Sequence, residues 1–166
     1  MTTSQASLRG ARLGHDGVVD LLGARHQCVL SFLGGDGWPR GVVLSYLWRD
    51  GRFWLTAVAG RAHVVGMQSD PRVTVTVERH DAGRQMLAQR GRAVFHGDRE
   101  VRARFYEEFA ARHAPDTTAA FAAQLDTPDR VVVEIAPVGV PTTHDSRRLA
   151  GDGRGSRDLR ADRRPR

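Results

Sequence analysis

Two Asp-Gly turns divide the early part of the sequence into three short β-rich runs, and this spacing constrains the fold more than any other feature. Asp and Gly both tolerate the positive φ angles of tight hairpin turns. Runs that are joined by such turns pair as antiparallel neighbours. The pattern therefore predicts two consecutive hairpins, so that three antiparallel strands open the domain. The runs cover residues 27–33, 38–48 and 52–58, and the turns contain Asp36-Gly37 and Asp50-Gly51.

The remainder of the chain alternates between further strand patterns and short amphipathic helices. Residues 72–78 alternate with a period of two, residues 86–95 form a strand in which Gly91 is expected to mark a bulge, and residues 130–137 form a last strand. Helices are expected at residues 15–25, 61–68, 98–113 and 117–125. About six brief strands with interspersed helices predict a mainly β fold, a six-stranded antiparallel barrel with helical additions.

The length of 166 residues and the hydrophobic content of 40% fit one domain with appendages. We expect a flexible N-terminus over residues 1–14, a folded domain over residues 15–144 and a disordered Arg-rich tail over residues 145–166. No apolar run reaches the length of about 18 residues that a spanning helix needs, and the N-terminus lacks the apolar run of a secretory signal. These features predict a cytoplasmic protein without membrane contact.

The basic charge is concentrated in the tail. The formal net charge is +6, and residues 145–166 contain 8 Arg and 4 Asp. All 25 basic residues are Arg, which is typical of GC-rich coding, so the charge alone does not indicate an anionic partner. Nucleic-acid binding through the tail is retained as an alternative, without specific recognition being expected.

The residue types that are missing exclude several chemistries. Without lysine, the chain cannot form a Schiff base or use a phosphate-loop lysine. The single Cys28 excludes an internal disulfide and a multi-cysteine metal site, and the pair His26 and Cys28 is too small a ligand set, so no metal site is expected. Redox chemistry would need a bound cofactor.

A phosphate site is predicted around the end of the third strand. Thr56 ends that strand, Gly60 permits close backbone approach, and a helix begins near Arg61. The first N–H groups of a helix and the positive end of its dipole attract anions. Arg61 adds a planar guanidinium that can bind a phosphate through two hydrogen bonds.

The order of these motifs resembles the pyridoxamine 5'-phosphate oxidase-like, flavin-binding split-barrel superfamily over roughly residues 15–140. The motifs that carry the resemblance are Asp36-Gly37-Trp38-Pro39, Asp50-Gly51, Leu55-Thr56, Gly60-Arg61-Ala62-His63, Asp70-Pro71-Arg72-Val73 and Arg90-Gly91-Arg92-Ala93.

The resemblance implies a six-stranded split β-barrel that forms a homodimer and binds FMN at the dimer interface. The strand with Val42, Val43 and Leu44 would address the polar edge of the flavin ring, and Trp54 and Leu55 would exclude water. The phosphate would lie at Thr56, Gly60, Arg61 and His63. The implied activity is that of a flavin-dependent oxidoreductase on a small organic substrate, in which the flavin supplies the redox chemistry and no side chain is assigned as a catalytic acid or base.

One departure from the family pattern leaves alternatives open. His63 stands where members of the family carry a lysine, so the phosphate affinity is either lower or supplied by Arg61 alone. The alternatives are a deazaflavin-dependent reductase on the same fold, a haem-binding split barrel and a cofactor-free binding module.

Overall fold

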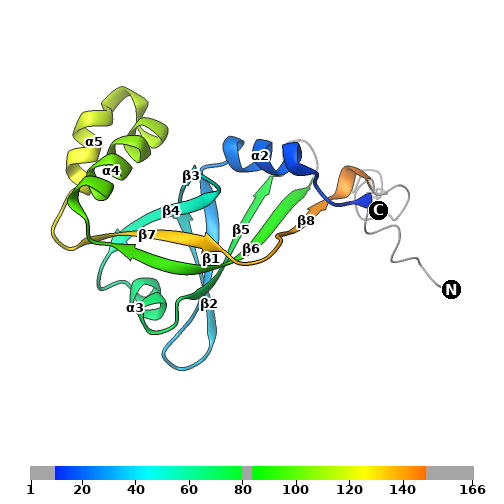
Figure 1. Ribbon diagram of the computed structural model, residues 1–166, viewed down its shortest axis with the longest axis horizontal. Helices are drawn as coiled ribbons and strands as arrows, with labels where there is room; N and C mark the ends of the chain where they lie inside the picture. The colour runs from blue at the N-terminus through cyan, green and yellow to red at the C-terminus, as the bar shows by residue number, and fades with distance from the viewer. Residues whose placement is uncertain (1–9, 80–83, 149–166) are drawn as a thin grey trace, which may run out of the picture.

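The computed structural model describes residues 10–79 and 84–148. This part of the chain contains four α-helices and an eight-stranded antiparallel sheet (Figure 1). The strands are β1 (Gln27–Leu33), β2 (Pro39–Ser45), β3 (Leu47–Arg49), β4 (Arg52–Val58), β5 (Arg72–Arg79), β6 (Gln85–His96), β7 (Arg130–Pro137) and β8 (Thr142–Asp145). The helices are α2 (His15–Ala24), α3 (Ala62–Ser69), α4 (Arg99–His113) and α5 (Thr118–Leu125), with short 3-10 turns η1 (Pro115–Thr117) and η2 (Ser146–Arg148). The fold is mainly β, as predicted.

The two Asp-Gly turns form the predicted hairpins. β1 pairs with β2, and β3 pairs with β4. Asp50 and Gly51 both have positive φ angles, 53° and 74°, which is the backbone that a two-residue hairpin turn requires. In the first turn, the Asp36 carboxylate accepts a hydrogen bond from the Trp38 N–H at 3.2 Å. Local turn chemistry therefore sets both reversals.

The expected strand over residues 38–48 is in fact two strands, which belong to opposite edges of the sheet. The strand order is β2-β1-β5-β6-β7-β4-β3, with β8 paired to β6. A single residue, Tyr46, separates the edge strand β2 from the edge strand β3. The sheet must therefore curl until its two edges meet, and Tyr46 is buried there with its hydroxyl donating to the Leu22 carbonyl at 2.9 Å. The result is a half-barrel.

The described part of the chain has eight strands where six were predicted. The short β3 and β8 were missed because strands this brief carry no periodicity of their own. The predicted bulge at Gly91 is also wrong, since the pairing of β6 with β5 and β7 continues in register through this residue. Gly91 instead permits a close approach, because a Cβ there would lie 2.4 Å from Ile135 Cγ2.

Two apolar cores stabilise the half-barrel. The larger core fills the inside of the curl and includes Leu30, Phe53, Leu55, Val75 and Ile135. The smaller core joins α4 and α5 to the outer side of β4 and β7. Asp98 caps the N-terminus of α4, because its carboxylate accepts hydrogen bonds from the N–H groups of Glu100 and Val101. In Figure 1, α4 and α5 lie on one side of β4 and β7 and α3 lies on the other. None of the helices in the described ranges is long and apolar enough to cross a membrane.

The domain boundaries extend beyond the predicted ones. Within the expected flexible N-terminus, Ala11 and Leu13 are buried, and within the expected tail, Asp145 is 1% exposed. The Asp145 N–H donates to the Ala11 carbonyl at 2.6 Å, so the two segments hold each other against the sheet. Ala11, Leu13 and Asp145 therefore pack with the folded domain, although the segments around them are polar in composition. Residues 1–9 and 149–166 lie outside the described residues.

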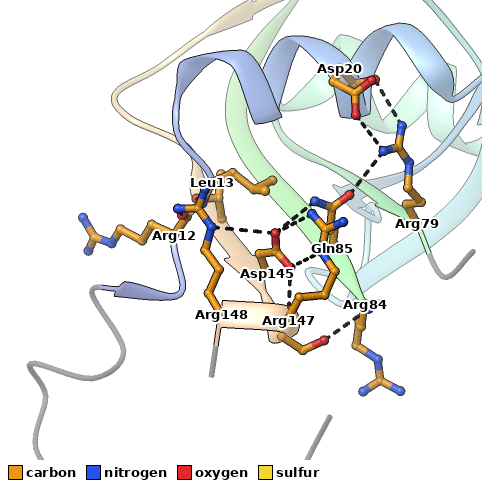
Figure 2. A network of polar contacts seen from close by, with 11 residues as sticks. Arg12, Leu13, Asp20, Arg79, Arg84, Gln85, Asp145, Arg147 and Arg148 are labelled. Carbon is orange, nitrogen blue, oxygen red and sulfur yellow. Dashed lines mark hydrogen bonds and ion pairs between the residues drawn. The ribbon is translucent and has the colours of Figure 1, made fainter. Parts of the chain in front are cut away.

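Asp145 is the centre of the polar network in Figure 2. Its carboxylate accepts hydrogen bonds from the Arg147 side chain at 2.7 and 2.9 Å and from the Gln85 amide at 3.1 Å. Gln85 accepts from Arg79 at 3.3 Å, and Arg79 pairs with Asp20 of α2 at 2.7 Å. The bonds from Arg147, followed by the bond from Gln85, hold the pKa of Asp145 below its usual range.

Asp145→Asn is expected to lower the free energy of unfolding by about 1.5 kcal/mol at neutral pH, because charge-assisted hydrogen bonds are lost. The pKa of Asp145 is lower in the folded state than in the unfolded state. Its contribution to the free energy of unfolding is therefore complete above the unfolded-state pKa of about 4, and it disappears as the pH falls through the folded-state pKa. In chemical denaturation, the difference between the two proteins should shrink below about pH 4. Exposed Asp116→Asn is the control, and equal stability of wild type and Asp145→Asn at pH 7 would contradict the role.

Candidate functional site

A pocket of about 440 Å³ opens where the two edges of the curled sheet approach one another. Strand β2 contributes Val42 and Leu44, and the end of β4 contributes a second wall. The complete lining is Val42, Leu44, Thr56, Ala57, Val58, Arg61, Ala62, His63 and Arg130. The pocket thus joins a strand edge, a helix N-terminus and the start of β7.

Both strands that line this pocket have a free edge. Among the described residues, β2 pairs only with β1, and residues 56–58 of β4 pair only with β7, because β3 covers only residues 52–54. A free strand edge presents backbone N–H and C=O groups that have no partner in the sheet. The pocket therefore offers both donors and acceptors to a planar polar group.

The N-terminus of α3 supplies further donors. The Arg61 N–H bonds the Val58 carbonyl at 3.1 Å, which turns the chain directly from β4 into the helix. The N–H groups of Val64 and Val65 both bond the Arg61 carbonyl, whereas those of Ala62 and His63 precede the first intrahelical bonds. These two free N–H groups and the helix dipole favour an anion at this end of the pocket.

The side chains around the anion end are cationic or neutral. Arg61 is exposed, Arg130 is half-buried, and neither has an ion pair within the described ranges. His63 is 8% exposed, and its Nε2 has no hydrogen-bond partner. Burial, followed by the charge of Arg61, lowers the pKa of His63, so the imidazole is neutral at pH 7. Thr56 donates its hydroxyl hydrogen to the Val131 carbonyl at 3.0 Å and presents only lone pairs.

The structure brings together five of the predicted site residues and separates the others. Val42, Leu44, Thr56, Arg61 and His63 all line the pocket.

The remaining predicted residues lie elsewhere. Val43 faces the opposite side of the sheet because neighbouring side chains in a strand alternate. Leu55 is buried in the larger core. Trp54 lies in the smaller core, between the Arg49 guanidinium at 4.0 Å and the His96 ring at 4.9 Å. Gly60 is exposed beside the pocket without lining it.

Arg130 is the charged residue of the lining that was not predicted from the sequence. It stands 69 positions after Arg61, and nothing in its local sequence distinguishes it from other arginines. Only the pairing of β4 with β7 places it opposite Val58, at the anion end of the pocket.

Two other pockets lie near the β1–β2 hairpin. One of about 420 Å³ is flanked by Arg72, Arg90 and Arg92, and one of about 550 Å³ by Cys28, His26 and His113. Burial raises the pKa of the Cys28 thiol to about 12, so it is not a ready nucleophile. The described residues contain no group of three or more His, Cys, Asp or Glu side chains that could hold a metal ion.

The curled antiparallel half-barrel with four helices is consistent with the split-barrel class of proteins. The family model described as pyridoxamine 5'-phosphate oxidase matches residues 15–144. The chain belongs to this family. No curated protein matches its sequence.

Several solved structures share the fold. A conserved hypothetical protein from Mycobacterium tuberculosis is similar with a TM-score of 0.75 and 23% identity, over 84% of this chain and 89% of that chain. The haem storage protein from Vibrio cholerae is similar with a TM-score of 0.66 and 11% identity, over 78% of this chain and 94% of that chain. A FAD-binding protein from Mesorhizobium loti is similar with a TM-score of 0.59 and 20% identity, over 81% of this chain and 96% of that chain. At these identities, the similarity concerns the fold.

Proposed function

We propose that the protein binds FMN in the pocket between β2 and β4 and acts as a flavin-dependent oxidoreductase on a small organic substrate. The observation that carries the proposal is the gathering of Arg61, neutral His63 and the N-terminus of α3 beside two free strand edges. A phosphate group and a planar ring with a polar edge are the two parts of FMN that these features fit.

The residues present divide into a phosphate end and a ring end. At the phosphate end, the Arg61 guanidinium and the N–H groups of Ala62 and His63 would donate hydrogen bonds. At the ring end, the free edge of β2 would pair with the polar side of the flavin, and Val42 and Leu44 would contact its apolar part. When bound, the flavin supplies the hydride-transfer chemistry, while the chain binds and orients it.

We also propose that a second copy of the chain covers the outer face of β1, β2 and β5. Val29 and Val43 are directly paired there and are 40% and 61% exposed. Next to them, the register places Ser31 beside Gly41 and Thr74, which continues this face with small uncharged side chains. Because this face adjoins the free edge of β2, a second copy would also enclose the open ring end of the pocket.

The test is a titration of the purified apoprotein with FMN, followed by the visible spectrum and by flavin fluorescence, with sedimentation velocity on the same samples. One FMN per chain in a dimer is expected. Separate samples with the deazaflavin coenzyme and with haemin test the rival cofactors. Failure to bind FMN would contradict the proposal, and a monomer with stoichiometric FMN would contradict the shared site.

A further inference from the structure

We infer that Arg130 is a second phosphate-binding residue of this pocket, and that together with Arg61 it selects ligands that end in a phosphomonoester. The inference rests on the proposed function and makes it more specific. In this inference, Arg130 of β7 supplies the positive charge that members of the family obtain from the lysine at the position of His63.

The backbone places Arg130 beside the phosphate loop. In the pairing of β4 with β7, Arg130 lies opposite Val58, and the Ala59 N–H bonds the Asp129 carbonyl at 2.8 Å. Arg61 follows Val58 in a tight turn, with its N–H on the Val58 carbonyl. The two arginines therefore flank the same short loop, one from the helix side and one from the sheet side.

Two nitrogen atoms on side chains that line this pocket are buried and have no hydrogen-bond partner. They are Nε of Arg130 and Nε2 of His63, each with almost no exposed surface. A buried polar atom without a hydrogen bond is unfavourable and uncommon in a folded protein. Neither atom has a partner within the described residues, so both side chains keep an unused hydrogen-bonding group next to the pocket.

The charge of the pocket favours a dianion. Its lining contains two guanidinium groups and no carboxylate among the described residues. A terminal phosphomonoester carries close to two negative charges at neutral pH, whereas a phosphodiester carries one. Two arginines and a helix N-terminus therefore stabilise FMN more than riboflavin, which has no phosphate, or a dinucleotide flavin, whose pyrophosphate bridge leaves one negative charge on each phosphate.

The experiment compares Arg130→Ala with wild type in fluorescence titrations with FMN and with riboflavin. Loss of a charge-assisted hydrogen bond should weaken FMN binding about 10-fold, and riboflavin binding should change by less than about 2-fold. Exposed Arg99→Ala, which keeps the total charge equal to that of Arg130→Ala, should bind FMN like wild type. Arg130→Lys should recover part of the loss, because it restores the charge without the planar fork.

A second measurement separates this inference from the proposed function. Inorganic phosphate should raise the melting temperature of wild type and of Arg99→Ala more than that of Arg130→Ala. If wild type binds no flavin but shows this phosphate effect, the proposed function fails and Arg130 remains an anion-binding residue. If Arg130→Ala binds FMN and responds to phosphate as wild type does, the inference is wrong.

Discussion

Gly66→Ala is expected to lower the free energy of unfolding by about 2 to 3 kcal/mol, although alanine is the better helix former. Gly66 lies in α3, where the helix crosses β1. A Cβ at this position would lie 2.5 Å from Phe32 Cδ2 and 2.8 Å from the Leu33 carbonyl oxygen. The carbonyl belongs to the backbone of a paired strand and cannot rotate away, so α3 itself must move outward.

This displacement should also affect the pocket. His63 and Ala62 lie in the first turn of α3, so a shift of the helix moves the donors at the anion end. We therefore expect Gly66→Ala to weaken FMN binding in the fraction that remains folded, measured below the unfolding transition.

The matched control is Gly23→Ala in α2. A Cβ on Gly23 meets no atom within 4 Å, so only the helix propensity changes there. Its stability should stay equal to that of wild type or rise by up to about 1 kcal/mol. Thermal and urea denaturation of the three proteins measure the difference. A Gly66→Ala protein as stable as Gly23→Ala would show that α3 does not need its close approach to β1.

Removal of both arginines from the pocket is expected to weaken FMN binding by at least about 100-fold, and removal of Arg61 alone by about 10-fold. The double variant Arg61→Ala/Arg130→Ala leaves only the N–H groups of α3 and the neutral His63 as donors at the anion end. Neither arginine has an ion pair within the described part of the chain, so the apoprotein should keep its stability.

The double-mutant cycle is measured with FMN and repeated with riboflavin. Because both guanidinium groups would bind the phosphate, each single loss and the combined loss of the double variant should be absent with riboflavin. The dependence of FMN affinity on salt should also become weaker in the double variant. Unchanged FMN affinity in Arg61→Ala would remove this residue from the site and would contradict the proposed position of the phosphate.

The elements that the sequence predicted well are those with strong local patterns. The alternation in Arg72–Arg79 is visible in the residues themselves, and so is the amphipathic pattern of Arg99–His113. Residues 47–48 were predicted only as the end of one long strand, and residues 142–145 gave no strand pattern, since three or four residues become a strand only when a partner strand binds them. The same holds for Asp145, whose burial depends on Arg147, Gln85 and the distant Ala11.

The candidate site likewise contains residues that the sequence could group and residues that only the structure could place. Thr56, Arg61 and His63 are close in sequence, so the end of a strand and the start of a helix were sufficient to group them. The sequence grouped Val43 with Val42 and Leu44, and only the structure shows that the Val43 side chain lies on the opposite face of β2.

The sequence by itself determined the two hairpins, the mainly β class and the turn from β4 into α3, because turn chemistry, side-chain periodicity and helix termini act over a few neighbouring residues. The tertiary structure alone decided that the sheet curls around Tyr46, that a pocket opens between β2 and β4, and that Arg130 lies beside that pocket. These features depend on strand order and register, which are set by contacts between residues far apart in the chain.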